Sequence, residues 1–222
     1  MSASWRVAVD GGETSALYEA ADGNQRAVFV AAHGAGGSMM DRAMAAVSAT
    51  LRRHGFGVVR FNFLYKERKS GRPDPMPTLT RTFAAVVDRA RTELGRNAGP
   101  LVIGGRSMGG RAGSMLAADG FAADGLLLLA YPLHPPGKPE QRRDKHLPAV
   151  GRRMLFLQGS RDAFGTPAEL APILSPLEPA ATLHEVAHGD HSFKLPRKDP
   201  AAQAALHADL QRVIEAWILS AP

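Results

Sequence analysis

The stretch Leu101-Val102-Ile103-Gly104-Gly105-Arg106-Ser107-Met108-Gly109-Gly110 decides how the rest of the chain is interpreted. Its apolar start predicts a buried strand and the residues 111–119 predict a helix, so Ser107 falls in the turn between them. Residues 105–109 fit the pattern G-x-S-x-G, in which glycine on both sides leaves room for a serine in a strained turn. Taken alone, the pattern is equally compatible with a glycine-rich connection of no chemical role.

The composition is that of an ordinary globular protein. With 222 residues, 45% of them hydrophobic and 22% charged, the chain is long enough to bury a sizeable core, and we expect one domain over 1–222. It has no cysteine, which excludes disulfides, thiolate metal ligands and a cysteine nucleophile. Residues 1–7 lack a signal-peptide pattern and no run approaches bilayer length, so we expect no membrane insertion and a cytoplasmic location.

The formal net charge of +6 raises the question of nucleic-acid binding. Basic residues gather at 60–72 and 138–153, but neither stretch carries a DNA-binding motif or the interleaved aromatic residues typical of single-strand binding. We therefore expect a generally basic surface and no nucleic-acid partner, because net charge by itself specifies a partner only weakly.

Strand and helix patterns alternate along the chain. An opening hairpin is predicted around Gly11-Gly12, and Thr78 or Thr80 is expected to cap the longest internal helix. Residues 132–148 contain too many prolines for a regular helix and are too few for a large lid. The predicted strands are 7–10, 15–20, 26–32, 57–61, 101–103, 125–131, 153–158 and 181–186, and the predicted helices are 41–54, 78–96, 111–119, 166–174 and 201–219.

This alternation predicts an α/β fold, with a mostly parallel central sheet and helices on both faces. In such sheets the functional groups lie beyond the carboxyl ends of the strands. His33, Ser107, Asp162 and His191 each follow a predicted strand. The fold is therefore expected to bring all four to one edge of the sheet.

The order Ser107, Asp162, His191 matches the chemistry of a serine nucleophile. A serine hydroxyl needs a base to take its proton, and a carboxylate holds the histidine in the required tautomer. Asp190 is a weaker candidate for the acid, because it adjoins His191 and is poorly placed to accept from that ring. His188 lies closer to the preceding strand than His191 and is therefore the weaker candidate for the catalytic base. A metal site in this loop would lack further ligands.

The developing oxyanion of acyl transfer needs two donors, for which we predict the backbone amides of Met108 and Ala35. His33 is expected to support the loop that carries Ala35. A glycine-rich loop at 33–38 also resembles a phosphate cradle, but the dinucleotide pattern fails at Met39 and the chain has no G-x-x-x-x-G-K-[ST] motif. We expect no cofactor.

With these residues the chain resembles the α/β-hydrolase superfamily over nearly its whole length. More narrowly, it is similar to the dienelactone-hydrolase-like group that includes the testis-expressed and NSL-complex hydrolase-like proteins. Leu64 departs from the proline expected at that position, which affects the pocket wall and leaves the triad intact. The stretches that carry the likeness are 60–65, 104–110, 131–139 and 189–193.

The resemblance implies an α/β-hydrolase fold with a minimal lid, nucleophile Ser107, acid Asp162 and base His191. It suggests a serine hydrolase that cleaves a small carboxylic ester or thioester. A scaffold or ligand-binding protein with little catalysis, and a peptidase or lactonase with the same triad, remain alternatives. The oligomeric state stays open.

The substrate pocket is less determined by the sequence than the triad. We expect an open or shallow pocket overhung by the two basic stretches, because the loops after residues 61 and 131 reach over the site in this fold. Cations there would favour an anionic substrate. The candidates for such cations are Arg68, Lys69, Arg142 and Arg143, and the substrate-binding candidates are Tyr65, His134 and Arg142.

Overall fold

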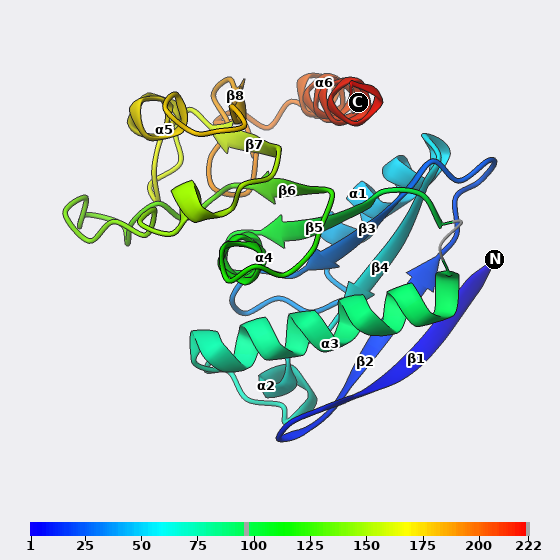
Figure 1. The fold of residues 1–222 in the computed structure, drawn as a ribbon. Helices are drawn as coiled ribbons and strands as arrows, with labels where there is room; N and C mark the ends of the chain where they lie inside the picture. The colour runs from blue at the N-terminus through cyan, green and yellow to red at the C-terminus, as the bar shows by residue number, and fades with distance from the viewer. Residues whose placement is uncertain (96–97, 221–222) are drawn as a thin grey trace.

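The computed structural model describes residues 1–95 and 98–220. In this part of the chain one sheet of eight strands has the order β1-β2-β4-β3-β5-β6-β7-β8 (Figure 1). β1 and β2 join the sheet in antiparallel pairs, and all other pairs are parallel, as predicted. The strands are β1 (Ser2–Val9), β2 (Gly12–Glu19), β3 (Ala27–Ala32), β4 (Phe56–Phe61), β5 (Leu101–Arg106), β6 (Gly125–Leu129), β7 (Met154–Gly159) and β8 (Thr182–Val186).

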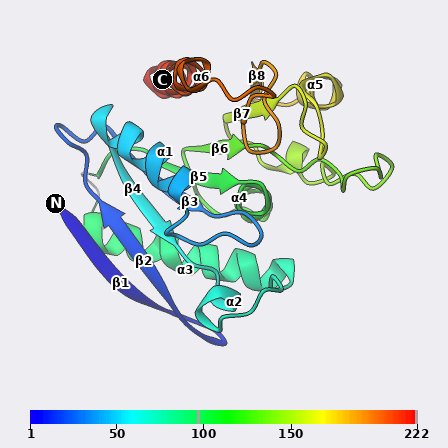
Figure 2. The same ribbon diagram turned by 180° about the vertical axis from the view of Figure 1, so that it is seen from behind.

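Helices cover both faces of the sheet, which confirms the predicted fold class (Figures 1 and 2). The helices are α1 (Arg42–Arg53), α2 (Leu64–Glu67), α3 (Met76–Leu94), α4 (Met108–Ala118), α5 (Pro167–Leu174) and α6 (Pro200–Leu219). Phe83 of α3, Leu116 of α4 and Leu170 of α5 pack into one hydrophobic cluster. Met44 of α1 and Leu210 of α6 belong to a second cluster on the other face. β6 is buried along its whole length because both clusters cover it.

The opening hairpin is longer than predicted. β1 pairs with β2 from Ser2 to Val9, and Trp5 and Val7 of β1 are buried against the cluster under α3. Burial on one side explains the extension, because alternate side chains of an edge strand still gain from covering the core. The hairpin therefore forms one edge of the sheet.

The third helix begins earlier and differently than expected. α3 starts at Met76 after Pro75, and no side chain caps its first turn. The Thr80 hydroxyl instead donates to the carbonyl of Pro77, 3.1 Å away. The prediction of a threonine cap was wrong. Pro77 in the first turn has no amide hydrogen, so one of the donors that a capping side chain would satisfy is absent. Its predicted end at Arg96 lies outside the described residues.

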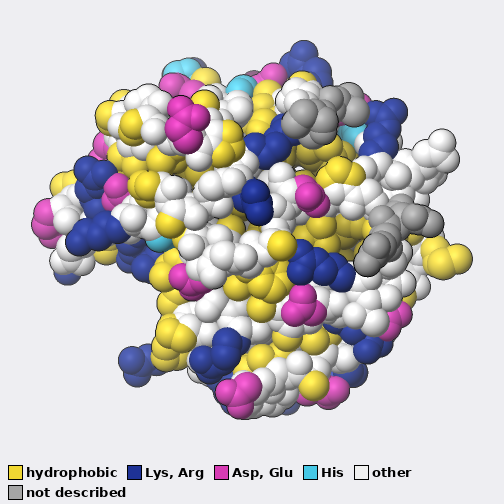
Figure 3. All heavy atoms as spheres, viewed as in Figure 1, with side chains coloured by type: hydrophobic (Ala, Val, Ile, Leu, Met, Phe, Trp, Pro, Cys, Tyr) yellow, Lys and Arg dark blue, Asp and Glu magenta, His cyan; other side chains and the backbone are white. Residues whose placement is uncertain are grey.

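The two segments after β4 and β6 also differ from each other. The first, predicted as a loop, contains α2, whose Leu64 and Tyr65 are buried. The second is irregular as predicted, apart from a short 3₁₀ turn at Leu147–Ala149. Basic side chains are dispersed among acidic and apolar ones on the face shown in Figure 3. No helix within the described residues has both the length and the hydrophobicity needed to cross a bilayer.

Candidate active site

Ser107 occupies the turn between β5 and α4 with φ of 52° and ψ of −117°. This is a backbone conformation that residues other than glycine seldom adopt, and it is found mainly where surrounding structure enforces it. The strand before it is longer than predicted, and the helix after it begins at Met108 rather than Arg111. Gly104 and Gly105 still pair in the sheet, because a parallel ladder uses only backbone groups.

Two glycines make room for this turn. A Cβ on Gly105 would lie 2.1 Å from the carbonyl oxygen of Ala32, and a Cβ on Gly109 would lie 2.4 Å from the same atom. Both contacts are much shorter than any real Cβ contact, so these positions require glycine. The obstruction comes from the end of β3, whose backbone passes directly against the turn.

Three side chains from three loops converge at the carboxyl edge of the sheet. Nε2 of His191 lies 2.9 Å from Oγ of Ser107. On the other side of the ring, Nδ1 lies 2.9 and 2.8 Å from the two carboxylate oxygens of Asp162. In this arrangement Nδ1–H donates to the carboxylate and Nε2 is free to accept the serine proton.

The carboxylate of Asp162 is completely buried and firmly held. The Phe164 amide donates to one of its oxygens at 2.8 Å, and the side-chain amide of Gln158 donates to the other at 2.9 Å. Gln158 also binds the backbone of Tyr131 and Gly165, so the loops after β6 and β7 share one anchor. A buried anion with several donors is a strong and well-oriented acceptor for His191.

The ring of His191 is held by further contacts. Phe164 stacks on it, with ring centroids 4.2 Å apart. The guanidinium of Arg106 donates to the His191 carbonyl at 3.1 Å and to Oγ of Ser192 at 2.8 Å. Asp190 accepts from the amides of Ser192 and Lys194 and thus closes the turn of its own loop. These contacts fix the position of the loop that follows β8.

The two predicted oxyanion donors lie beside Ser107. Ala35 and Met108 line the same pocket, and the hydrogen bonds of the described residues include no acceptor for either amide. His33 is buried, donates from Nδ1 to the Gly34 carbonyl at 2.8 Å and accepts from the Phe63 amide at 3.2 Å. Burial lowers its pKa, so it stays neutral and braces the loop that carries Ala35, as predicted.

A pocket of about 530 Å³ opens over Ser107 and His191, and we call it the Ser107 pocket. Three arginines line it, Arg106, Arg111 and Arg143, and none of them has a carboxylate partner among the described residues. Nε of Arg111 is buried and has no hydrogen-bond partner, and burial together with the charge of Arg111 lowers the pKa of Arg143. Arg111 and Arg143 beside Ser107 give this wall a positive potential, because the Asp74 carboxylate that also lines the pocket is paired with Arg68.

The remaining predicted substrate residues lie elsewhere. Tyr65 is fully buried against His33 and does not line the Ser107 pocket. His134 is buried and bonded to Glu169, 3.1 Å away. Arg142 pairs with Asp144, and Arg68 pairs with Asp74. Of the four predicted cations, Arg143 lines the pocket. Lys69 does not line it, and ion pairs with neighbouring carboxylates hold Arg68 and Arg142 away from it.

Sequence analysis missed Gln158, Phe164, Arg106 and Arg111. Arg111 was detectable, because it lies four residues after Ser107 and thus one helical turn along the same face. The Ser107 carbonyl indeed accepts from its amide at 3.0 Å. Gln158 and Phe164 carry no such signal, since neither a polar residue near the end of a buried strand nor an aromatic residue in the loop after it has a fixed partner until the strands are assembled.

Comparison with known proteins agrees with this architecture. Residues 25–219 match the family described as alpha/beta hydrolase domain, which is most of the chain. The chain therefore belongs to the alpha/beta hydrolase family.

Solved structures of the same fold include three enzymes or enzyme homologues. An alpha-beta serine hydrolase homologue from Coxiella burnetii has a TM-score of 0.75 at 15% identity, with 96% of both chains covered. A dienelactone hydrolase from Anabaena variabilis has a TM-score of 0.75 at 17% identity, with 99% of this chain and 97% of that one covered. A serine hydrolase without lid from Xanthomonas campestris has a TM-score of 0.71 at 24% identity, with 95% and 94% covered. The likeness to the testis-expressed and NSL-complex proteins stays a prediction.

Proposed function

We propose that this protein is a serine hydrolase that cleaves a carboxylic ester or thioester through an acyl-enzyme on Ser107. The observation that carries the proposal is the unbroken chain of contacts from Ser107 through His191 to the buried Asp162, in the wall of an accessible pocket. A hydroxyl, a base and an orienting carboxylate at hydrogen-bond distance are the parts that nucleophilic acyl transfer needs.

In the first half of the reaction, Oγ of Ser107 attacks the carbonyl carbon and its proton passes to Nε2 of His191. Asp162 stabilises the resulting imidazolium. The amides of Ala35 and Met108 donate to the tetrahedral oxyanion. The intermediate collapses when the alcohol or thiol leaves with the proton from His191. His191 then takes a proton from water, and the water oxygen attacks the acyl-enzyme. As this second tetrahedral intermediate collapses, His191 returns the proton to Oγ of Ser107 and the acid is released.

The cations of the Ser107 pocket favour a substrate with a second, anionic group. Arg111 and Arg143 repel each other and lack a carboxylate of their own among the described residues. A carboxylate on the acyl chain or on the leaving group would relieve that repulsion and satisfy Nε of Arg111. We therefore keep the prediction of an anionic substrate and assign it to Arg111 and Arg143.

A fluorophosphonate probe followed by peptide mapping tests the proposed nucleophile. We expect covalent labelling of Ser107 in the folded protein and none after heat denaturation or in Ser107→Ala. A folded protein that stays unlabelled at Ser107 would support the scaffold alternative and overturn the proposal. A screen of esters, thioesters, lactones and peptides with wild type and Ser107→Ala then separates the acyl classes.

A further inference from the structure

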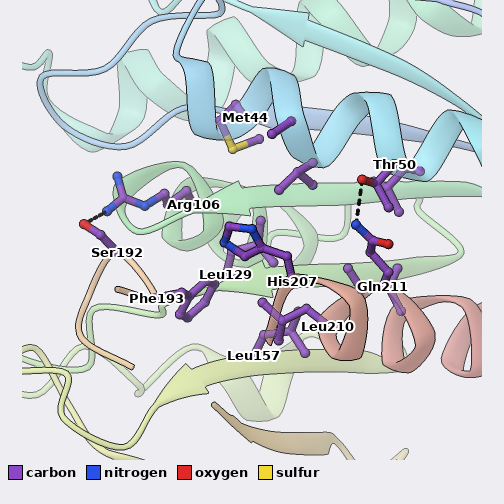
Figure 4. A pocket seen from close by; sticks show the side chains of 14 residues that line it. Met44, Thr50, Arg106, Leu129, Leu157, Ser192, Phe193, His207, Leu210 and Gln211 are labelled. Atoms are coloured by element: carbon purple, nitrogen blue, oxygen red, sulfur yellow. Dashed lines mark hydrogen bonds between the residues drawn. The ribbon is translucent and has the colours of Figure 1, made fainter. Parts of the chain in front are cut away.

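A second cavity of about 140 Å³ lies between α1 and α6, on the sheet face opposite α3 and α4. Figure 4 shows its side chains, with Arg106 and Ser192 at one end and Thr50 and Gln211 at the other. The exposed residues Ala46, Ser192 and His207 line it too, so it is open to solvent. We call it the α1–α6 cavity.

The interior of the α1–α6 cavity is built for an apolar group. Its deep walls are the buried side chains of Met44, Leu51, Leu129, Leu157, Leu210 and Ile214. A water molecule there would lack the two to four polar partners that buried water needs. The polar pair at one end is already satisfied, because Gln211 donates to Thr50 at 2.8 Å. An apolar ligand that fits gains close contacts with these walls that solvent does not supply.

Arg106 supplies a charge at the opposite end. Its guanidinium donates to two neutral oxygens, those of the His191 carbonyl and the Ser192 hydroxyl. The ion pairs among the described residues do not include Arg106. The same side chain lines the Ser107 pocket, so it lies where the two hollows meet. The α1–α6 cavity thus combines an apolar interior with one cation at its end.

We propose that the α1–α6 cavity is a binding site, separate from the Ser107 pocket, for a small monocarboxylate of about six carbons, most of them in its apolar tail. The tail length follows from the volume, because an apolar cavity of about 150 Å³ accepts a molecule of the size of benzene. The carboxylate is the group that Arg106 selects. This site does not depend on the proposed hydrolase activity, and its test needs no turnover.

Methyl NMR of protein labelled at the methionine methyl groups distinguishes the two hollows. Met44 lines the α1–α6 cavity, whereas Met76 and Met108 line the Ser107 pocket. Titration with hexanoate is expected to shift the Met44 signal in a saturable way, and Met44→Leu identifies that signal. Hexan-1-ol has a similar tail without the charge, and we expect it to bind about tenfold more weakly.

Two substitutions locate the binding further. Ala46→Met places a larger side chain in the mouth and is expected to weaken hexanoate binding at least about tenfold. Ala208→Met is the matched control, because Ala208 is exposed on α6 and does not line the cavity. It should leave the affinity unchanged. Arg106→Gln is expected to bring hexanoate down to the affinity of hexan-1-ol.

Three results would overturn the proposal. The first is a Met44 signal that does not move, and the second is a shift confined to Met76 and Met108, which would place hexanoate in the Ser107 pocket. The third is equal affinity for hexanoate and hexan-1-ol, which would show that Arg106 does not select a carboxylate. Ser107→Ala should bind hexanoate at Met44 as wild type does, so loss of the hydrolase proposal leaves this one standing.

Discussion

The Ser107 pocket and the α1–α6 cavity share Arg106 but are built on different principles. The Ser107 pocket lies at the ends of strands, where loops bring together Ser107, His191 and Asp162 beside three arginines that form no ion pair among the described residues. The α1–α6 cavity lies between helices and is walled mainly by aliphatic side chains of the second core. The sheet therefore places reactive groups at one edge and an apolar cavity on one face, and the side chain of Arg106 borders both.

The largest expected effect is the loss of turnover when Ser107 is replaced. Ser107→Ala should lower kcat by at least about 10⁴-fold while the free energy of unfolding stays near that of wild type, because the rest of the triad depends on the nucleophile. Steady-state kinetics and urea unfolding check this. A residual rate within tenfold of wild type would mean that Ser107 is not the nucleophile.

The strand that leads into the Ser107 turn is the next point to test. Gly105→Ala should destabilise the protein by about 3 kcal/mol or more, because the new Cβ would lie 2.1 Å from the Ala32 carbonyl and Gly105 has φ of 135°. Gly23→Ala is the matched control, since no atom lies within 4 Å of its Cβ position. Urea denaturation compares the two, and equal stabilities would refute the close packing of β5 against β3.

The two cations Arg111 and Arg143 of the Ser107 pocket should favour anionic substrates. The double variant Arg111→Met, Arg143→Met is expected to lower kcat/KM for the 4-nitrophenyl monoester of succinate about a hundredfold and to change that for 4-nitrophenyl butyrate little, because only the first carries a carboxylate. Arg142→Met is the control, as Arg142 pairs with Asp144. Equal values of kcat/KM of the wild type for both esters at low salt would show that the protein has no preference for an anionic substrate.

The smallest effect concerns pH near the Ser107 pocket. Burial and the charge of Arg111 lower the pKa of His146 to about 4 from 6.5. The unfolded chain binds this proton first as pH falls, so the stabilisation is complete above pH 6.5 and is lost towards pH 4. The shift corresponds to about 3 kcal/mol, and we expect about 2 kcal/mol because solvent screens this partly exposed ring. His146→Gln should flatten the stability between these pH values relative to wild type, as urea unfolding at a series of pH values would measure.

Predictability differed between the strands and the loops that join them. The parallel sheet and the positions of Ser107, Asp162 and His191 beyond its strands followed from local patterns, because apolar runs and glycine-flanked turns are short-range features. Tyr65 and Arg142 were proposed because the loops after residues 61 and 131 were expected to overhang the site. Burial of the first and the ion pair of the second take both away from the pocket, and neither contact has a local signature.

The sequence by itself determined the fold class and the order of the three residues that meet at the sheet edge. Only the tertiary structure decided that Gln158 and Phe164 hold the Asp162 carboxylate, that Arg111 and Arg143 face the pocket, and that α1 and α6 leave a cavity between them. The physical reason is distance along the chain. A turn or a strand is specified by adjacent residues, whereas a buried hydrogen bond, a charge without a partner or a gap between helices exists only after remote segments have packed.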